Sequence, residues 1–269
     1  MRKKIYIAYT GGTIGMKKSP QGYIPVEGYI TDVLNSMKEL SRPEMPEFTV
    51  NEYCPVIDSS NMSPNDWQFI ANDIQNKYDD YDGFVVLHGT DTMAYTASAL
   101  SFMFKNLSKP VIVTGSQIPL SEIRSDGLNN LLNSLYLAAH HPISEVGLFF
   151  NNRLYRGNRA TKADADGFNA FESPNYPALI EAGIQIEVNK NALLSASTIF
   201  DAPIQPLQVT DIKDQPIGVV SLYPGISHLV IANILAQPVN ALIIQSYGVG
   251  NAPENQALLN EIKHATERE

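Results

Sequence analysis

Residues 4–13 read KIYIAYTGGT, a predicted strand at residues 4–9 followed by Thr10, a pair of glycines and Thr13. A second run of this kind, GFVVL at residues 83–87, is followed by HGT at residues 88–90. Outward from these two, the pattern predicts strands near 48–53, 110–113 and 146–151. Between them it predicts a helix beginning at Pro64, with Ser63 as its N-cap, and helices over about 92–104 and 127–140. Strands that alternate with helices indicate an α/β fold with a mostly parallel sheet flanked by helices.

The pattern breaks down from residue 189, and we predict two domains. Residues 1–188 form a larger N-terminal domain, 189–215 a linker rich in proline and polar residues, and 216–269 a smaller, incomplete C-terminal α/β domain. The C-terminal part has the pattern of two strands, near 217–223 and 241–246, and two helices, near 226–235 and 255–266. Sheets of so few strands are seldom stable alone, so we expect another surface to cover this part.

Composition limits the classes of function. The net charge is −9, which argues against a nucleic-acid partner because phosphate binding needs a basic surface. A single cysteine, Cys54, excludes an internal disulfide, and we expect it to be buried beside a strand. The apolar stretch after the basic start is too short for a signal peptide, and no segment is long and apolar enough to cross a membrane. We therefore expect a cytoplasmic protein without a membrane partner.

Two segments that follow strands carry hydroxyl groups. Gly11 and Gly12 permit a tight turn that presents Thr13 and directs backbone N–H groups inward, and the second segment presents Thr90. In sheets of this kind, ligands bind beyond the carboxyl ends of the strands. The first turn fits neither a P-loop nor a dinucleotide-binding loop. Taken alone, this turn is better interpreted as a simple bend between strand and loop.

A third segment, NRATKAD at residues 158–164, contains Lys162. A threonine hydroxyl is a poor nucleophile and needs a base, and a lysine can serve when burial disfavours its ammonium form. Asp91 beside Thr90 is placed to orient such an amine, although it also favours the charged form. Lys162 by itself fits an ordinary loop lysine as well.

Together these segments resemble a known family. YTGGTIGM at 9–16, VVLHGTDTM at 85–93 and Thr161–Lys162 are similar to the bacterial L-asparaginases, as are IDSSNM at 57–62, TGSQIP at 114–119, RSDG at 124–127 and SYGVGNAP at 246–253. The similarity runs nearly the whole length. It is stronger to the cytoplasmic type I branch than to the periplasmic type II branch.

The resemblance implies roles for individual residues. Thr13 attacks the amide carbon and forms an acyl-enzyme, Tyr23 on a mobile lid helps to activate it, and Thr90, Lys162 and Asp91 form a second triad. Which threonine attacks first stays open. Asp58, Ser59 and Asp91 hold the α-carboxylate and α-amino groups of the substrate. The remaining substrate-binding candidates are Ser60, which stands where the periplasmic branch has glutamine, and Ser116, which contributes its backbone.

The expected activity is hydrolysis of L-asparagine to L-aspartate and ammonia, without cofactor or metal, in a homodimer or homotetramer. The histidines lack zinc-binding spacing, and we expect His88 to be structural. Family members continue past a helix ending near residue 269, so the resemblance implies a chain truncated at its C-terminus and leaves open whether the shortened chain is active. Two alternatives also stay open, an enzyme of mixed glutaminase and asparaginase specificity and an inactive amino-acid-binding form.

Overall fold

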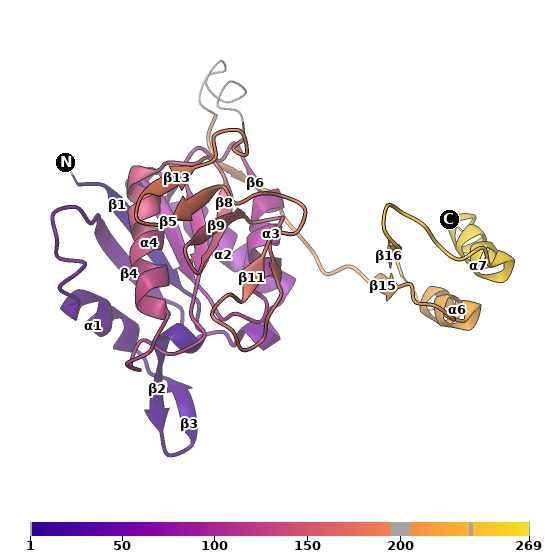
Figure 1. The fold of residues 1–269 in the computed structure, drawn as a ribbon, viewed down its shortest axis with the longest axis horizontal. Helices are drawn as coiled ribbons and strands as arrows, with labels where there is room; N and C mark the ends of the chain where they lie inside the picture. Colours follow the sequence, from indigo (N-terminus) through magenta and orange to yellow (C-terminus); the bar gives the residue numbers. More distant parts are fainter. Residues whose placement is uncertain (1, 195–204, 237–238, 269) are drawn as a thin grey trace. The chain divides into compact units, whose positions relative to one another are not determined.

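The computed structural model describes residues 2–194, 205–236 and 239–268 (Figure 1). The chain forms two compact units, Met1–Ile212 and Lys213–Glu269. The predicted domain boundaries after residues 188 and 215 stay predictions. Residues 195–204 of the predicted linker lie outside the described part of the chain.

The first unit is built on an eight-stranded sheet with the order β13-β12-β9-β8-β7-β5-β1-β4. Neighbouring strands from β4 through β8 pair in parallel, whereas β8, β9, β12 and β13 pair antiparallel at the other side of the sheet. The mostly parallel α/β fold predicted from the sequence is confirmed. The strands are β1 (Lys4–Tyr9), β4 (Glu47–Glu52), β5 (Gly83–Leu87), β7 (Val111–Thr114), β8 (Val146–Phe150), β9 (Arg153–Arg156), β12 (Ile180–Ala182) and β13 (Ile186–Val188).

Both faces of this sheet are covered by helices (Figure 1). Successive side chains of a strand point to opposite faces, so Ile5 and Ile7 of β1 enter one core cluster and Tyr6 and Ala8 enter another. The first cluster includes residues of α1 (Tyr29–Ser36) and α4 (Gly127–His140). The second includes residues of α2 (Pro64–Lys77) and α3 (Met93–Met103). Burial on both faces explains why β1 and β5 are almost wholly apolar.

Local sequence sets where α2 begins. Pro64 is its first residue, and the carboxylate of Asp66 accepts a hydrogen bond from the backbone N–H of Ser63 at 2.8 Å. Proline is favoured at this position because its missing N–H would have no partner in the first turn. The helix start predicted at Ser63–Pro64 is confirmed.

Smaller elements complete the first unit. A hairpin of β2 (Met16–Ser19) and β3 (Gly22–Pro25) follows the first glycine turn, and a short ribbon joins β10 (Thr161–Lys162) to β11 (Phe171–Glu172). A third pair joins β6 (Phe104–Lys105) to β14 (Gln208–Val209). The expectation that Cys54 is buried is wrong: it is exposed because β4 ends at Glu52 and the chain then turns into a surface loop.

The second unit contains a parallel pair of strands, β15 (Ile217–Ser221) and β16 (Ala241–Gln245), with α6 (His228–Ala236) and α7 (Gln256–Thr266). These four elements confirm the predicted pattern. Its small core joins Val220 of β15, Ile231 of α6 and Leu258 of α7. The other face of the strands leaves apolar side chains exposed, at Ile217, Val219 and Ile243.

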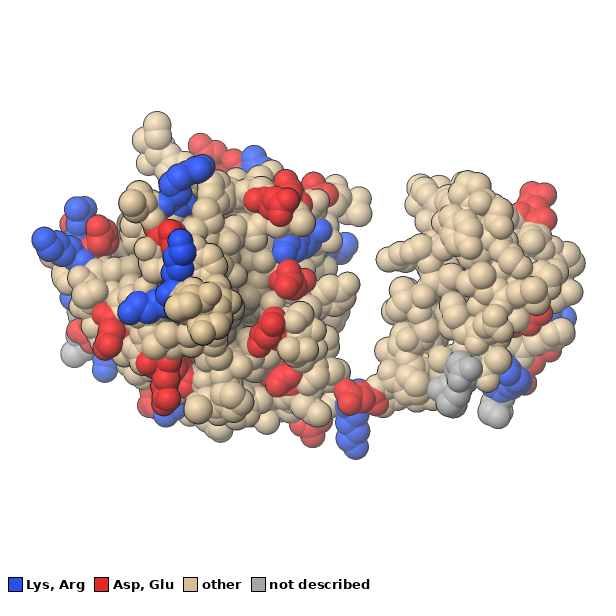
Figure 2. Space-filling model, turned by 90° about the horizontal axis from the view of Figure 1, so that it is seen from below, with Lys and Arg blue, Asp and Glu red and all other residues tan. Residues whose placement is uncertain are grey.

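Charged side chains are unevenly distributed. On the visible face of the first unit, Lys and Arg are interspersed with Asp and Glu, whereas most of the visible face of the second unit is uncharged (Figure 2). Within the described residues, no helix has both the length and the apolar character that a membrane crossing requires.

Candidate active site

Three loops meet at the carboxyl edge of the parallel strands, and their backbones are in contact. A β-carbon on Gly12 would lie 2.4 Å from the Gly89 nitrogen, and one on Gly11 would lie 2.3 Å from the Ile57 carbonyl oxygen. Gly11 and Gly12 also have φ values of +135° and +92°, a backbone conformation that residues with a β-carbon rarely adopt. Glycine at these positions therefore brings the Thr13 loop against the loops that carry Ser59 and Thr90.

Hydrogen bonds fix the same three loops to one another. Thr10 donates to the Leu87 carbonyl oxygen through both its backbone N–H and its hydroxyl, each at 3.0 Å. The Ile57 N–H donates to the Thr10 carbonyl oxygen at 2.6 Å. The Thr92 hydroxyl donates to the Ser59 carbonyl oxygen, also at 2.6 Å. The loops are thus part of one rigid layer above the strands, which is the kind of support that a binding site needs.

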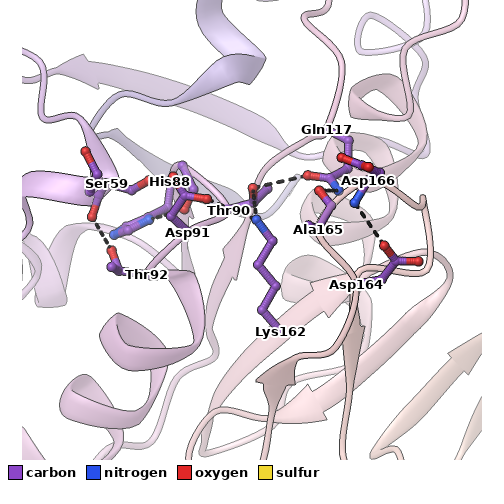
Figure 3. A network of polar contacts seen from close by, with 12 residues as sticks. Ser59, His88, Thr90, Asp91, Thr92, Gln117, Lys162, Asp164, Ala165 and Asp166 are labelled. Atoms are coloured by element: carbon purple, nitrogen blue, oxygen red, sulfur yellow. Dashed lines mark hydrogen bonds and ion pairs between the residues drawn. The ribbon is translucent and has the colours of Figure 1, made fainter.

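Thr90, Asp91 and Lys162 form a contact network in this layer (Figure 3). The Lys162 amine donates to the Thr90 hydroxyl oxygen and to a carboxylate oxygen of Asp91, each at 3.0 Å. Thr90 is buried, Lys162 is about one-fifth exposed and Asp91 faces solvent. The lysine therefore lies between a buried hydroxyl group and an exposed carboxylate, within proton-transfer distance of the hydroxyl.

Lys162 reaches Thr90 because of the β10–β11 ribbon, in which it pairs with Phe171. Phe171 is buried in the core beneath and anchors the ribbon. Beyond the lysine, the Asp164 carboxylate accepts hydrogen bonds from the N–H groups of Asp166 and Gly167 at 2.9 and 3.0 Å, which lower the pKa of Asp164. These bonds give the loop after Lys162 a defined shape.

Gln117 is a neighbour of the site that the sequence did not reveal. The Thr90 hydroxyl donates to its side-chain oxygen at 3.1 Å, and its amide nitrogen donates to the carbonyl oxygens of Ala165 and Gly167 at 3.0 and 3.1 Å (Figure 3). These two acceptors fix which end of the amide faces Thr90. Gln117 belongs to the segment TGSQIP at 114–119, and that match was the only signal that pointed to it.

The predicted substrate-binding residues lie around the same edge. Asp58 accepts a hydrogen bond from the Ser60 N–H at 3.0 Å and begins a short 3-10 helix, Ser59–Asn61. Ser59 is buried, and its hydroxyl lies so close to Gly89 that a β-carbon there would be 2.4 Å away. Ser60 is exposed. The buried Ser116 hydroxyl donates to the Ile118 carbonyl oxygen at 2.6 Å, so its hydrogen already has an acceptor.

Thr13 and Tyr23 have different surroundings. Thr13 begins a 3-10 helix, Thr13–Gly15, and is partly buried. Tyr23 lies on β3, and its hydroxyl donates to the Glu122 carboxylate at 2.9 Å. That bond raises the pKa of Tyr23. In this structure the tyrosine hydroxyl is thus directed to Glu122.

Within residues 2–194, 205–236 and 239–268, no group of three or more His, Cys, Asp and Glu side chains is arranged to hold a metal ion.

A parallel α/β sheet with threonine loops at its carboxyl edge places hydroxyl groups there, and one of them, that of Thr90, lies beside a lysine amine that can move a proton. The asparaginase N-terminal family model matches residues 4–194. L-asparaginase 1 of Escherichia coli K12 is 63% identical over 272 residues, which span 99% of this chain and 77% of that protein. With this relative, the fold and the site define an enzyme of the amidohydrolase class.

Solved structures agree. Superposition on L-asparaginase I from Vibrio cholerae gives a TM-score of 0.91 at 62% identity, covering 100% of this chain and 79% of the other. The thermostable L-asparaginase from Thermococcus kodakarensis gives a TM-score of 0.80 at 27% identity, covering 99% of this chain and 78% of the other. The chain belongs to the asparaginase family, as the sequence motifs predicted.

Proposed function

We propose that the chain hydrolyses L-asparagine to L-aspartate and ammonia through a threonine nucleophile, with Thr13 attacking first. The observation that supports this most is the Lys162 amine, 3.0 Å from both the Thr90 hydroxyl oxygen and Asp91, with the Thr90 loop packed against the Thr13 turn. The names of the relatives, L-asparaginase 1 and L-asparaginase I, support the substrate.

The chemistry has two steps. The Thr13 oxygen bonds to the side-chain amide carbon of asparagine, the carbon–nitrogen bond breaks, and the threonine proton ends on the departing ammonia. Water then cleaves the ester, which gives aspartate and restores the Thr13 hydroxyl. Two easier steps replace one difficult attack on a poor electrophile.

Thr90, Lys162 and Asp91 act as the second triad in this scheme. In the structure the Thr90 hydrogen faces Gln117 while Lys162 donates to the Thr90 oxygen. When the amine is neutral and the hydroxyl turns from Gln117 toward it, the same 3.0 Å contact carries the proton from threonine to lysine. The triad thereby moves protons to and from the reacting groups.

The substrate's charged end is held by the residues around the loops. Asp58 and Asp91 accept hydrogen bonds from the α-amino group, and Ser59 with backbone N–H groups near Ser60 and Ser116 donates to the α-carboxylate. Tyr23 must leave Glu122 to assist Thr13, so the β2–β3 hairpin closes over the bound substrate. We propose a cytoplasmic homodimer or homotetramer as the working form.

Ammonia release from L-asparagine and L-glutamine by the full chain, compared with Thr13→Ala, tests the proposal. Thr13→Ala is expected to lose at least about a thousandfold in kcat, because no covalent route is left. The control is Ser101→Ala, which removes a hydroxyl from α3 and should keep the wild-type rate. A Thr13→Ala enzyme that keeps most of its activity would exclude Thr13 as the nucleophile.

The same assay separates the alternatives. A larger kcat/KM for glutamine than for asparagine would favour mixed specificity with glutamine as the preferred amide, since one methylene changes binding by only about 1–3 kcal/mol. Calorimetric binding of asparagine without any ammonia would favour the amino-acid-binding form.

A further inference from the structure

His88 is a buried side chain that none of the roles above uses. It lies between β5 and Thr90, and its ring contacts a hydrogen-bonding group at each end. The Nδ1 atom is 2.7 Å from the Gly89 carbonyl oxygen, and the Nε2 atom is 2.8 Å from the Thr96 hydroxyl oxygen. That hydroxyl oxygen also accepts the indole N–H of Trp67 at 2.9 Å.

The direction of every bond in this chain follows from the two groups at its ends. A carbonyl oxygen only accepts, so Nδ1 of His88 carries the hydrogen. An indole N–H only donates, so the Thr96 oxygen accepts from Trp67 and its own hydrogen faces Nε2. Burial lowers the pKa of His88 to about 4, which agrees with a neutral ring. Donation therefore runs from Trp67 to Thr96 to His88 to Gly89.

The last acceptor belongs to the peptide that joins Gly89 to Thr90. Glycine leaves this backbone freer to rotate than any other residue would. A side chain cannot supply the restraint here, because a β-carbon on Gly89 would meet the Ser59 hydroxyl at 2.4 Å. The imidazole N–H thus restrains the peptide from which Thr90 projects.

We propose that His88 is a positioning residue for Thr90: its Nδ1–H holds the Gly89–Thr90 peptide so that the Thr90 hydroxyl stays within reach of Lys162. The consequence for catalysis rests on the function proposed above, whereas the effect on the backbone does not.

Two substitutions separate the contribution of the hydrogen bond at Nδ1 from that of the hydrogen bond at Nε2. His88→Asn places an amide N–H near the position of Nδ1 and keeps a donor to Gly89, whereas His88→Gln reaches the position of Nε2 and contacts Thr96 instead. The expected kcat of His88→Asn exceeds that of His88→Gln by about tenfold, the effect of one lost buried hydrogen bond, while KM changes less. Ser101→Ala on the same helix as Thr96 is the control and should retain the wild-type kcat.

The backbone effect is measured without turnover, from the Thr90 amide resonance in a two-dimensional ¹H–¹⁵N spectrum. It should stay near its wild-type position in His88→Asn and Ser101→Ala and move in His88→Gln. In the wild-type chain, a long-range ¹H–¹⁵N spectrum of the histidine rings should show His88 with its hydrogen on Nδ1, a readout that needs no variant to fold.

Three results would overturn the proposal: a hydrogen on Nε2 in the wild type, a Thr90 resonance that is unmoved in His88→Gln, or a kcat of His88→Gln equal to that of His88→Asn. If the wild-type chain releases no ammonia from any amide, the proposed function fails, and the ring tautomer and the Thr90 resonance alone decide the role of His88.

Discussion

At the scale of single residues, the amine of Lys162 lies between two oxygens of different character, a buried hydroxyl and an exposed carboxylate. The same amine can donate to both oxygens and, when neutral, accept a proton from one of them. Its position on a short ribbon anchored by Phe171 makes this contact a property of the fold.

Lys162→Met is expected to lower kcat by about 10²–10⁴, the usual contribution of a proton-transferring group, and to leave asparagine binding largely intact. Methionine keeps most of the side-chain volume while removing the amine. Steady-state kinetics with calorimetric binding checks this, with the exposed Lys190→Met as the control. Weaker asparagine binding with an unchanged kcat would mean that Lys162 mainly holds substrate.

His88 also makes stability depend on pH. Its pKa is about 4 in the folded chain because burial disfavours the charged ring, against 6.5 in the unfolded chain. The unfolded state therefore binds more protons between these values, and stability falls as the pH drops from about 6.5 toward 4.

Urea unfolding at pH 7 and pH 4 measures this contribution of His88 to the free energy of unfolding. Between pH 7 and pH 4, the free energy of unfolding should fall by about 3 kcal/mol more in the wild type than in His88→Asn, because the variant has no ring to protonate. Ser101→Ala retains the histidine, and its free energy of unfolding should change with pH as that of the wild type does. The same change with pH in the wild type and in His88→Asn would contradict the prediction.

At the scale of elements, the β2–β3 hairpin is tied to the loop after Pro119 by the Tyr23–Glu122 hydrogen bond. Tyr23 is exposed, so water competes for both partners of this hydrogen bond and the tyrosine hydroxyl can exchange Glu122 for another partner. In the proposed mechanism, Glu122 competes with the site for the tyrosine hydroxyl.

Glu122→Ala is therefore expected to raise kcat/KM by about threefold, since Tyr23 loses its competing acceptor. Tyr23→Phe should lower it. The exposed Glu39→Ala serves as the control in the same ammonia assay. A fall in Glu122→Ala as large as that in Tyr23→Phe would show that Glu122 supports the active pose.

The elements that the sequence predicted are those with a strong pattern. β1, β5 and α4 begin and end at the predicted residues because long apolar runs and amphipathic periods define them. The β2–β3 hairpin and the three-residue strands β12 and β13 were missed, since they are too short to show a period.

The residues of the candidate site also fall into those that the sequence predicted and those that it did not. Thr13 and Thr90 were noticed because glycine-rich segments directly follow strands, and their roles were predicted from the resemblance to the asparaginases. Gln117 was not, because its orientation depends on carbonyl groups 48 and 50 residues further along the chain. Contacts of that range are set by the tertiary fold and leave no local pattern.

At the scale of the whole molecule, the second unit exposes apolar residues of its two parallel strands, which in most proteins are covered on both faces. Ile217, Val219 and Ile243 are each at least half exposed. Apolar surface of this kind favours association.

Replacing both Val219 and Ile243 by threonine should lower the average mass seen by light scattering at a given protein concentration, since threonine keeps the strand shape but adds a hydroxyl. Ile184→Thr, at a fully exposed isoleucine of the first unit, should leave the mass unchanged. An unchanged mass in the double variant would show that this face does not drive association.

The position of Trp67, which donates to Thr96 in the first unit, has one more consequence, because it is the only tryptophan in the sequence. Its fluorescence emission reports the first unit alone, while far-ultraviolet circular dichroism sees the helices of both. Recording the two signals in one denaturation experiment resolves whether the units melt together or one after the other.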